Sequence, residues 1–317
     1  MRLSILLFLL LLAAGPLAHA ATWDEPWQET VVKKADYLVL ARVTATDAHK
    51  GATATILRSL GGEPLTGTVQ ISEFYGLQLC GDTTGEAPTF ELGGTDSCYF
   101  FLQKKPSGDY AIATPTTGFA RVRRGQVAAT YRHSYHQAQV PLAVYEATMT
   151  AIFRHYHGQA YAAQPIEELI NTTLTLPPAH LDAVGRTTFF LQHAALETIY
   201  HLGLTTHYDA VMPFLRDTTN FHAQVSAARA LTATPTPEDK QQLVRIVSSK
   251  SSRDLAKVVA ITTLLAYKPT ELKSQLADLA EGASNEPNGF GGNIMDPRIC
   301  TRVPSVKEAL ATLIAEL

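Results

Sequence analysis

The chain has 317 residues, of which 46% are hydrophobic, and its 26 Lys and Arg nearly balance its 29 Asp and Glu. That length is enough for two domains. The weak negative charge and the lack of a basic stripe argue against nucleic acid as a partner, so we expect none.

The N-terminal segment has the order of a secretory signal peptide. A positive charge at Arg2 precedes an almost unbroken apolar run over residues 3–14, and small residues follow. We predict a signal peptide over residues 1–20, cleaved between Ala20 and Ala21. The apolar run is shorter than the about 20 residues that span a bilayer. The sequence therefore predicts a secreted or periplasmic protein with no stable membrane insertion after signal removal; an N-terminal anchor helix is the alternative.

Short β-branched and aliphatic runs alternate with turn signals in the first half of the chain. Since no helical periodicity separates these runs, they predict a small antiparallel barrel or sandwich. Arg124-Gly125 lies between two of the runs and predicts a hairpin. We assign residues 21–135 to this β-barrel domain. The expected strands are 37–44, 52–57, 69–72, 99–102, 110–113, 119–122 and 127–131.

The first two expected strands carry a family resemblance. Ala35-Asp36-Tyr37 opens the first strand, and Leu60-Gly61-Gly62 closes the second. This resembles the netrin/tissue-inhibitor-of-metalloproteinases type of OB barrel, in which an "AD-x-V" strand precedes a strand that ends in a Lys-Gly type of turn. The resemblance implies an OB-like barrel. The inhibitors of that family bind the protease zinc through an N-terminal cysteine, whereas this mature chain would begin at Ala21, so inhibition by that mechanism is not implied.

The chain contains three cysteines. In an exported protein, Cys80 and Cys98 are the natural disulfide pair, because they flank a loop rich in Gly, Thr and Pro. Closing that loop would contribute about 3 kcal/mol. Two unpaired thiols are the alternative. Cys300 is either a buried thiol or a partner for another chain.

Helical periodicity begins after the strands. Residues 136–185 predict a helical connector, with an amphipathic helix over 141–157 and a short helix over 165–170. Residues 186–317 then repeat at a period of about 32, a length typical of stacked helix pairs. Expected helices of this part are 182–203, 207–216, 220–231, 238–248, 253–267, 270–281 and 305–317. The repeated apolar triplets are Ala194-Ala195-Leu196, Ser226-Ala227-Ala228 and Val258-Val259-Ala260.

This pattern resembles HEAT-like α-solenoid repeats in a short form, and it lacks the tetratricopeptide and ankyrin signatures. The resemblance implies a stacked surface that binds a protein or peptide. Residues 282–295 interrupt the array with a turn-rich insert, which is either a loop on the binding side or a plain connector. The overall prediction is an α+β protein of two domains: an OB-like antiparallel barrel, then a HEAT-like helical solenoid.

Histidine groups are the first place to look for chemistry. His133 and His136 form one close group, and His155 and His157 form another; together they could bind a metal, but their spacing matches no metal motif. Solvated histidines near a domain junction are the simpler interpretation. Motifs for nucleophilic catalysis and phosphate binding are also lacking. We therefore predict no catalytic, cofactor-binding or metal-binding residues and no cofactor.

Three functional hypotheses follow from these observations. The first is an exported, non-enzymatic scaffold whose helical repeats bind a protein or peptide. The second is an inhibitor or modulator of an extracellular hydrolase that acts through the barrel. The third is a structural envelope protein that links two other components, which an intermolecular disulfide at Cys300 would favour. The lack of catalytic motifs and the 32-residue period favour the first.

Overall fold

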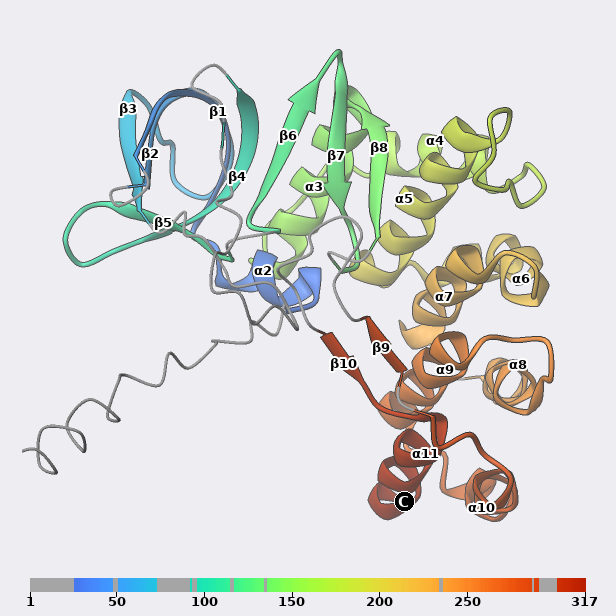
Figure 1. Ribbon diagram of the computed structural model, residues 1–317. Helices are drawn as coiled ribbons and strands as arrows, with labels where there is room; N and C mark the ends of the chain where they lie inside the picture. Colours follow the sequence, from blue (N-terminus) through green and yellow to red (C-terminus); the bar gives the residue numbers. More distant parts are fainter. Residues whose placement is uncertain are drawn as a thin grey trace, which may run out of the picture.

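The computed structural model describes residues 26–47, 51–72, 92, 96–114, 117–133, 136–233, 236–286, 288–290 and 301–317, with side chains for all of these except 288–290 and 301–302. A closed β-barrel with additional strands comes first, and stacked helices follow (Figure 1). This architecture confirms the predicted fold class. The predicted signal peptide lies outside the described residues and stays a prediction.

Five strands close the barrel. Their hydrogen-bonded order is β1-β2-β3-β5-β4, and a further pairing of β1 with β4 completes the circle. Every pairing is antiparallel except that of β3 with β5, which is parallel. The barrel is therefore OB-like, as predicted, but not purely antiparallel. The strands are β1 (Tyr37–Asp47), β2 (Gly51–Gly61), β3 (Thr68–Ser72), β4 (Ser97–Lys104) and β5 (Tyr110–Ile112).

Strand β1 lies between two hydrophobic cores. Val39, Ala41 and Val43 point into the barrel, where they belong to one buried cluster. Leu38 and Leu40 point the other way and belong to a second cluster, which continues into the helices. Because both faces are covered, the strand has a nearly continuous apolar run in place of strict alternation.

Three further strands extend the sheet beyond the barrel. They are β6 (Phe119–Arg123), β7 (Gln126–Thr130) and β8 (Gln137–Pro141), and β4 joins them to the barrel by pairing with β6. Arg124 and Gly125 have φ angles of 51° and 77°, which are typical of a two-residue type I′ turn, so the predicted hairpin is confirmed. Strand β8 was not predicted, because its Gln and Ala residues have low β-propensity.

Two helices connect the sheet to the rest of the chain. Helix α2 (Gln28–Lys34) precedes β1 and buries Val31 and Val32. The Trp-rich segment before it gave no helical prediction, because α2 is too short to show periodicity. Helix α3 (Leu142–Tyr156) packs against β2, β7, β8 and α2. Its buried face includes Met149 and Phe153, as predicted.

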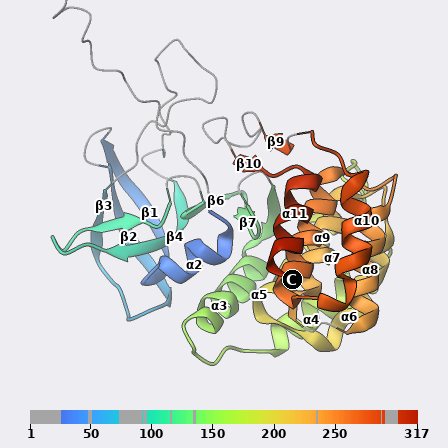
Figure 2. The ribbon, with the colours of Figure 1, turned by 90° about the horizontal axis from the view of Figure 1, so that it is seen from below.

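The remaining helices stack in two rows. Helices α5, α7, α9 and α11 form an inner row in which each packs against the next, whereas α4, α6, α8 and α10 form an outer row (Figure 2). The helices are α4 (Gln164–Thr173), α5 (Arg186–Leu202), α6 (Tyr208–Arg216), α7 (Phe221–Ala230), α8 (Pro237–Ser248), α9 (Asp254–Tyr267), α10 (Lys273–Glu281) and α11 (Val306–Glu316), with 3₁₀ turns at Thr205–His207, Leu231–Ala233 and Thr270–Leu272.

The 32-residue period corresponds to one step along this stack. The three repeated triplets lie at equivalent positions of α5, α7 and α9, and every residue in them is buried. Small side chains at these positions let neighbouring helices of the inner row approach closely. The repeat is therefore a consequence of packing: each helix pair buries one face against the pair before it.

The end of the stack differs from the prediction in one respect. The insert contains strand β9 (Asn288–Phe290), which pairs with β10 (Thr301–Val303) just before α11. Helix α11 begins with a capping box, in which Ser305 and Glu308 each accept a hydrogen bond from the other's backbone amide. It packs against α9 and α10 and completes a fourth helix pair.

Cys98 lies on β4, is buried inside the barrel and has no disulfide partner among the described residues. Burial raises the pKa of this thiol to about 12, with a smaller contribution from Asp96, so it is protonated at neutral pH. Its predicted disulfide partner, Cys80, lies outside the described residues, as does Cys300. The disulfide therefore stays a prediction.

The barrel provides a paired test of how closely its strands approach. At Gly51, with a φ of +91°, a Cβ atom would lie 2.1 Å from the carbonyl oxygen of Ile71 on β3, whereas Gly67, with a φ of +79°, has open space. We expect Gly67→Ala to lower the free energy of unfolding by about 1–2 kcal/mol, through backbone strain alone. Gly51→Ala adds the displacement of β3 and should lower it by about 3 kcal/mol or more.

Urea denaturation followed by circular dichroism measures both values. Equal losses for the two variants would contradict the close approach of β2 and β3 at Gly51.

Candidate functional site

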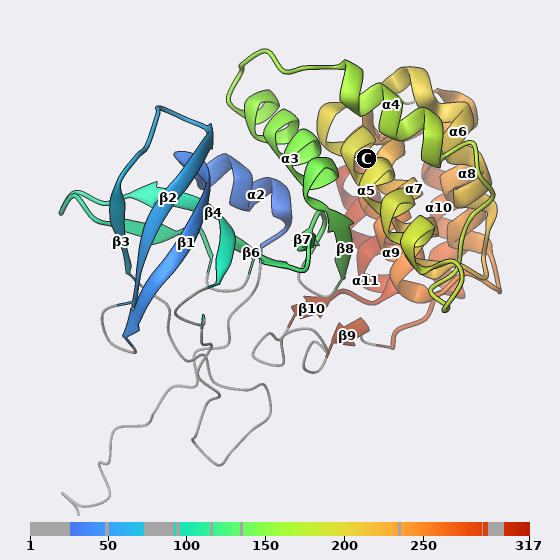
Figure 3. The same ribbon diagram turned by 90° about the horizontal axis from the view of Figure 1, so that it is seen from above.

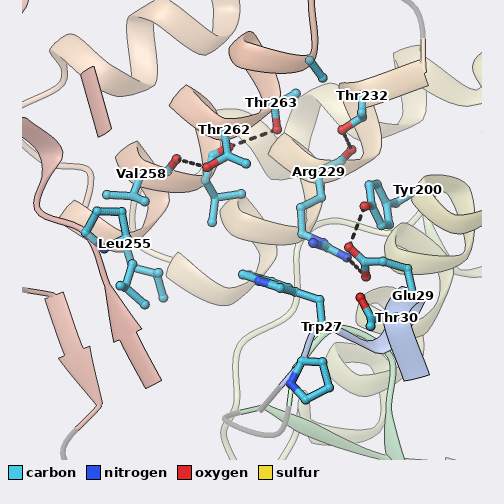
Figure 4. A pocket seen from close by; sticks show the side chains of 15 residues that line it. Trp27, Glu29, Thr30, Tyr200, Arg229, Thr232, Leu255, Val258, Thr262 and Thr263 are labelled. Carbon is cyan, nitrogen blue, oxygen red and sulfur yellow. Dashed lines mark hydrogen bonds and ion pairs between the residues drawn. The ribbon is translucent and has the colours of Figure 1, made fainter. Parts of the chain in front are cut away.

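A pocket of about 490 Å³ opens on the inner row of helices, where α2 and β10 approach them (Figure 4). Its volume is within the range of about 300–1,000 Å³ that is usual for ligand sites. Residues from α2, α5, α7, α9 and the β10–α11 connection contribute to it, so segments far apart in sequence meet there. The lining residues are Pro26, Trp27, Glu29, Thr30, Tyr200, Arg229, Thr232, Leu255, Val258, Val259, Thr262, Thr263, Ala266, Val303 and Pro304.

The long wall of the pocket is one stripe of α9. Leu255, Val258 and Val259 form its buried part, and the helical spacing of three and four places Thr262 and Ala266 on the same face. The last two residues are exposed and lie at the rim. This wall offers methyl and methylene groups to an occupant.

Three of the four threonines that line the pocket, Thr232, Thr262 and Thr263, add little polarity, because their hydroxyls already donate to backbone carbonyls. Thr262 donates to the carbonyl of Val258 at 3.0 Å, and Thr232 donates to the carbonyl of Arg229 at 2.6 Å. Thr263 likewise donates to two backbone carbonyls. A hydroxyl that is bound to its own helix is a poor donor for a ligand.

A stacked arginine forms the charged end of the pocket. The guanidinium of Arg229 lies 3.9 Å from the ring centroid of Tyr200 and 4.7 Å from that of Trp27. Its Nη2 donates to Glu29 Oε2 at 3.2 Å, and the Tyr200 hydroxyl donates to Glu29 Oε1 at 2.9 Å. Planar guanidinium groups combine stacking and ion pairing in this way, which lysine cannot do.

Behind the charged end, Glu197 anchors a fully buried network. Its Oε2 accepts from Arg229 Nε at 3.0 Å, and its Oε1 accepts from the Ser226 hydroxyl at 2.6 Å. Arg132, which follows β7, forms an ion pair with the same carboxylate at 3.5 Å. The side chains of Glu197 and Arg132 are both 0% exposed. The network therefore connects α2, the sheet extension, α5 and α7, and its centre at Glu197 and Arg132 is closed to water, whereas Glu29 on α2 is 18% exposed.

Glu29 is ionised in this setting. Burial raises the pKa of its carboxyl. The charge of Arg229, with smaller contributions from His201 and hydrogen bonds, lowers the pKa by more than burial raises it, so the net pKa lies below the usual value. Two arginines and two glutamates then balance one another, and the charged end carries no net charge.

Three histidines lie next to this network. His136 precedes β8, and its ring centroid lies 4.2 Å from that of His193 on α5 and 4.3 Å from that of His222 on α7. Burial, and then the positive charge of Arg132 and of the neighbouring imidazoles, holds the pKa of His136 and His193 well below the usual range. Burial also lowers the pKa of His222, to about 3. All three imidazoles are therefore neutral at pH 7.

The structure separates the two histidine groups that the sequence suggested. His133 packs against Trp27, and His157 stacks on Phe153 of α3. His155 is exposed near the end of the same helix. Among the described residues, no three His, Cys, Asp or Glu side chains are spaced to hold a metal ion.

The described side chains that line the pocket include few of the groups that enzymes use for catalysis. Of the described residues that line it, none is a His, Cys or Lys, and the carboxylate of Glu29 is engaged by Arg229 and Tyr200. A general base has to reach a substrate proton, and a nucleophile needs a base beside it. Among the described lining side chains, the Tyr200 hydroxyl lies beside the Glu29 carboxylate, but burial raises the pKa of this hydroxyl, so it is a weak nucleophile at neutral pH.

No family model, curated protein or solved structure matches this chain. The described helices include none with the length and apolarity that a membrane span requires. The site therefore has to be interpreted from its own residues.

Sequence reasoning missed the site, but one signal was present. Glu197 and Arg229 are 32 residues apart, and Ile261 follows after another 32, so all three occupy the same position of successive repeats. Opposite charges at one repeat position, at a place where the repeat is otherwise apolar, predict a buried pair between adjacent units.

Removing the charge of Glu197 tests the network. Glu197→Gln leaves Arg132 and Arg229 buried with an incomplete counter-charge, so we expect the free energy of unfolding to fall by about 3–5 kcal/mol. The measurement is urea denaturation. Glu271→Gln is the matched control, since it breaks the surface pair between Lys240 of α8 and Glu271 of the 3₁₀ turn before α10, and it should leave the midpoint nearly unchanged.

Equal effects of Glu197→Gln and Glu271→Gln would contradict the buried network.

Acid should weaken the same interface. The unfolded histidines take up protons below about pH 6.5, whereas the folded ones resist, so the unfolded state binds more protons and stability falls with pH from there downward. Glu29 adds to this loss below its unfolded pKa of 4.5, because its folded pKa is lower. Each excess proton changes the free energy of unfolding by about 1.4 kcal/mol per pH unit.

Urea midpoints between pH 5 and pH 7.5 measure this dependence. His136→Phe should reduce the pH dependence of the free energy of unfolding by the contribution of about one proton. His155→Gln, at an exposed position, should leave this pH dependence unchanged. A flat profile for the unaltered protein would contradict neutral buried histidines.

Proposed function

We propose that this protein is an exported, non-enzymatic scaffold that binds a partner protein on the inner row of its helical repeats. One observation carries the proposal. The pocket on that row has an apolar wall three helical turns long, and the charged groups at its end, Arg229 and Glu29, are already paired within the protein. Such a site gains free energy by excluding water from apolar surface, and it holds no group positioned for catalysis. The stacked helix pairs support the HEAT-like resemblance, which implies the same kind of surface.

Export is the part of the proposal that the sequence supports. Residues 1–20 have the order of a signal peptide, so we place the mature chain in the periplasm or outside the cell. The pairing of Cys80 with Cys98 would fit that oxidising environment. We expect no nucleic acid as a partner, because the charge of the chain is weakly negative.

A second candidate function rests on the barrel. Its five strands close in an OB-like order, which supports the resemblance to the netrin/tissue-inhibitor-of-metalloproteinases barrel. An inhibitor or modulator of an extracellular hydrolase would use the outer face of this barrel, where Thr44 on β1 is exposed. The predicted mature N-terminus at Ala21 still argues against zinc chelation by an N-terminal cysteine.

Affinity capture with four variants distinguishes the two functions. The mature chain is the bait, and envelope and secreted fractions of the host are the source. Thr262→Phe and Ala266→Phe each place a ring at the exposed rim of the pocket, so we expect both to lose a stoichiometric partner. Ala277→Phe, on an exposed position of α10 in the outer row, should retain it.

Thr44→Arg is the barrel control. Loss of a captured hydrolase with Thr44→Arg, and its retention by both pocket variants, would overturn the scaffold proposal in favour of the inhibitor.

A further inference from the structure

We infer that the pocket takes an extended, uncharged segment of the partner, with apolar side chains at alternate positions. The inference rests on the proposed function and names the chemistry of its ligand. Length, wall composition and charge of the pocket each restrict that ligand independently.

The pocket is long for its volume. Its α9 wall runs from Leu255 to Ala266, a span of 11 residue steps, or about 16 Å at the helical rise. An extended chain covers about 3.3 Å per residue. The wall therefore matches about five extended residues, whereas a single side chain would fill only one turn of it.

The wall selects apolar groups. Leu255, Val258 and Val259 line it with aliphatic side chains, and the indole of Trp27 lies on the opposite side (Figure 4). Side chains of an extended peptide alternate in direction, so every second one can enter while the others face away. A segment of the pattern apolar-polar-apolar-polar-apolar thus fits better than a continuous apolar run.

Charge disfavours elongated anionic ligands. A fatty acid or a nucleotide brings a negative charge that needs a cation at one end of the site. Arg229 is the cation at the end of this pocket, and it already lies between the carboxylates of Glu29 and Glu197. An anion placed there would add to two negative charges at close range. A peptide segment within a longer chain has no terminal charge and avoids this repulsion.

Strand β10 supplies a neighbour of the right shape. Its last residue, Val303, and the adjoining Pro304 form part of the pocket lining. Figure 3 shows the β9–β10 pair at the edge of the inner row, on the side away from the outer helices. An extended ligand between α9 and β10 would lie against helix on one side and strand on the other, a mode in which side-chain pockets give specificity.

The test uses a tryptophan of the chain itself. Trp23 and Trp27 are the only two tryptophans, so Trp23→Phe leaves Trp27 as the sole emitter inside the pocket. The probes are N-acetylated, C-amidated pentapeptides of the form X-Thr-X-Thr-X, in which X is Val, Leu, Ile or Phe. Isomers with the same composition and contiguous apolar residues are the matched controls, and sodium laurate is the anionic probe.

We expect saturable changes in Trp27 emission with members of the alternating set, weaker binding of the isomers and no response to laurate. Adding Ala266→Phe should weaken the binding about tenfold or more, whereas adding Ala277→Phe should not change it. Circular dichroism establishes that each variant is folded.

Failure of the inference and failure of the proposed function give different results. Binding of laurate without binding of the peptides would overturn the inference and identify an acyl-chain site. Equal binding of both peptide sets, or no binding of either, would also overturn the inference. The scaffold proposal would still be supported in that case if Ala266→Phe abolished partner capture. Peptide binding that Ala266→Phe weakens would support the ligand chemistry, and partner capture unaffected by Ala266→Phe would overturn the scaffold proposal alone.

Discussion

Glu197 is a carboxylate without access to water, and the arrangement of the two halves depends on keeping it paired. Removing a carboxylate from water carries a large penalty unless counter-charges and hydrogen bonds replace the solvent. Arg229 comes from the next repeat, and Arg132 comes from the sheet extension. Because each partner belongs to a different part of the chain, the parts cannot separate without leaving a buried charge unpaired. The barrel, the sheet and the repeats are thereby held in one relative position.

This constraint also shapes the pocket. Arg229 contacts Glu197 on its inner side and Glu29 on its outer side, and the second contact places α2 over the inner row. Trp27, at the start of α2, is held by stacking on the same guanidinium. These contacts of Arg229 therefore help to hold one wall of the pocket in place. The proposed binding site and the interface between the two halves therefore share Arg229.

Local patterns predicted most of the fold, because a periodicity of two or of 3.6 residues can be recognised from residues that are close together in the sequence. The strands around Val39 and Ile112 and all repeat helices followed from such patterns. The pocket did not, because its contacts join residues far apart: Tyr200 binds Glu29 across 171 positions, and Arg229 binds it across 200. Helix α2 is too short to show a period, and the Gln and Ala residues of β8 have low β-propensity. Their positions depend on tertiary contacts that no short window contains.

The repeat position of Glu197 also explains where binding is possible. On α5 and α7 this position holds Glu197 and Arg229, which bind each other and the chain's own N-terminal part. On α9 it holds Ile261, which is buried in the stack. The third unit therefore makes no ionic contact at this position, and its adjoining stripe from Leu255 to Ala266 lines a pocket instead. The same repeat geometry is used twice: charged positions join the two halves, and apolar ones leave a surface for a ligand.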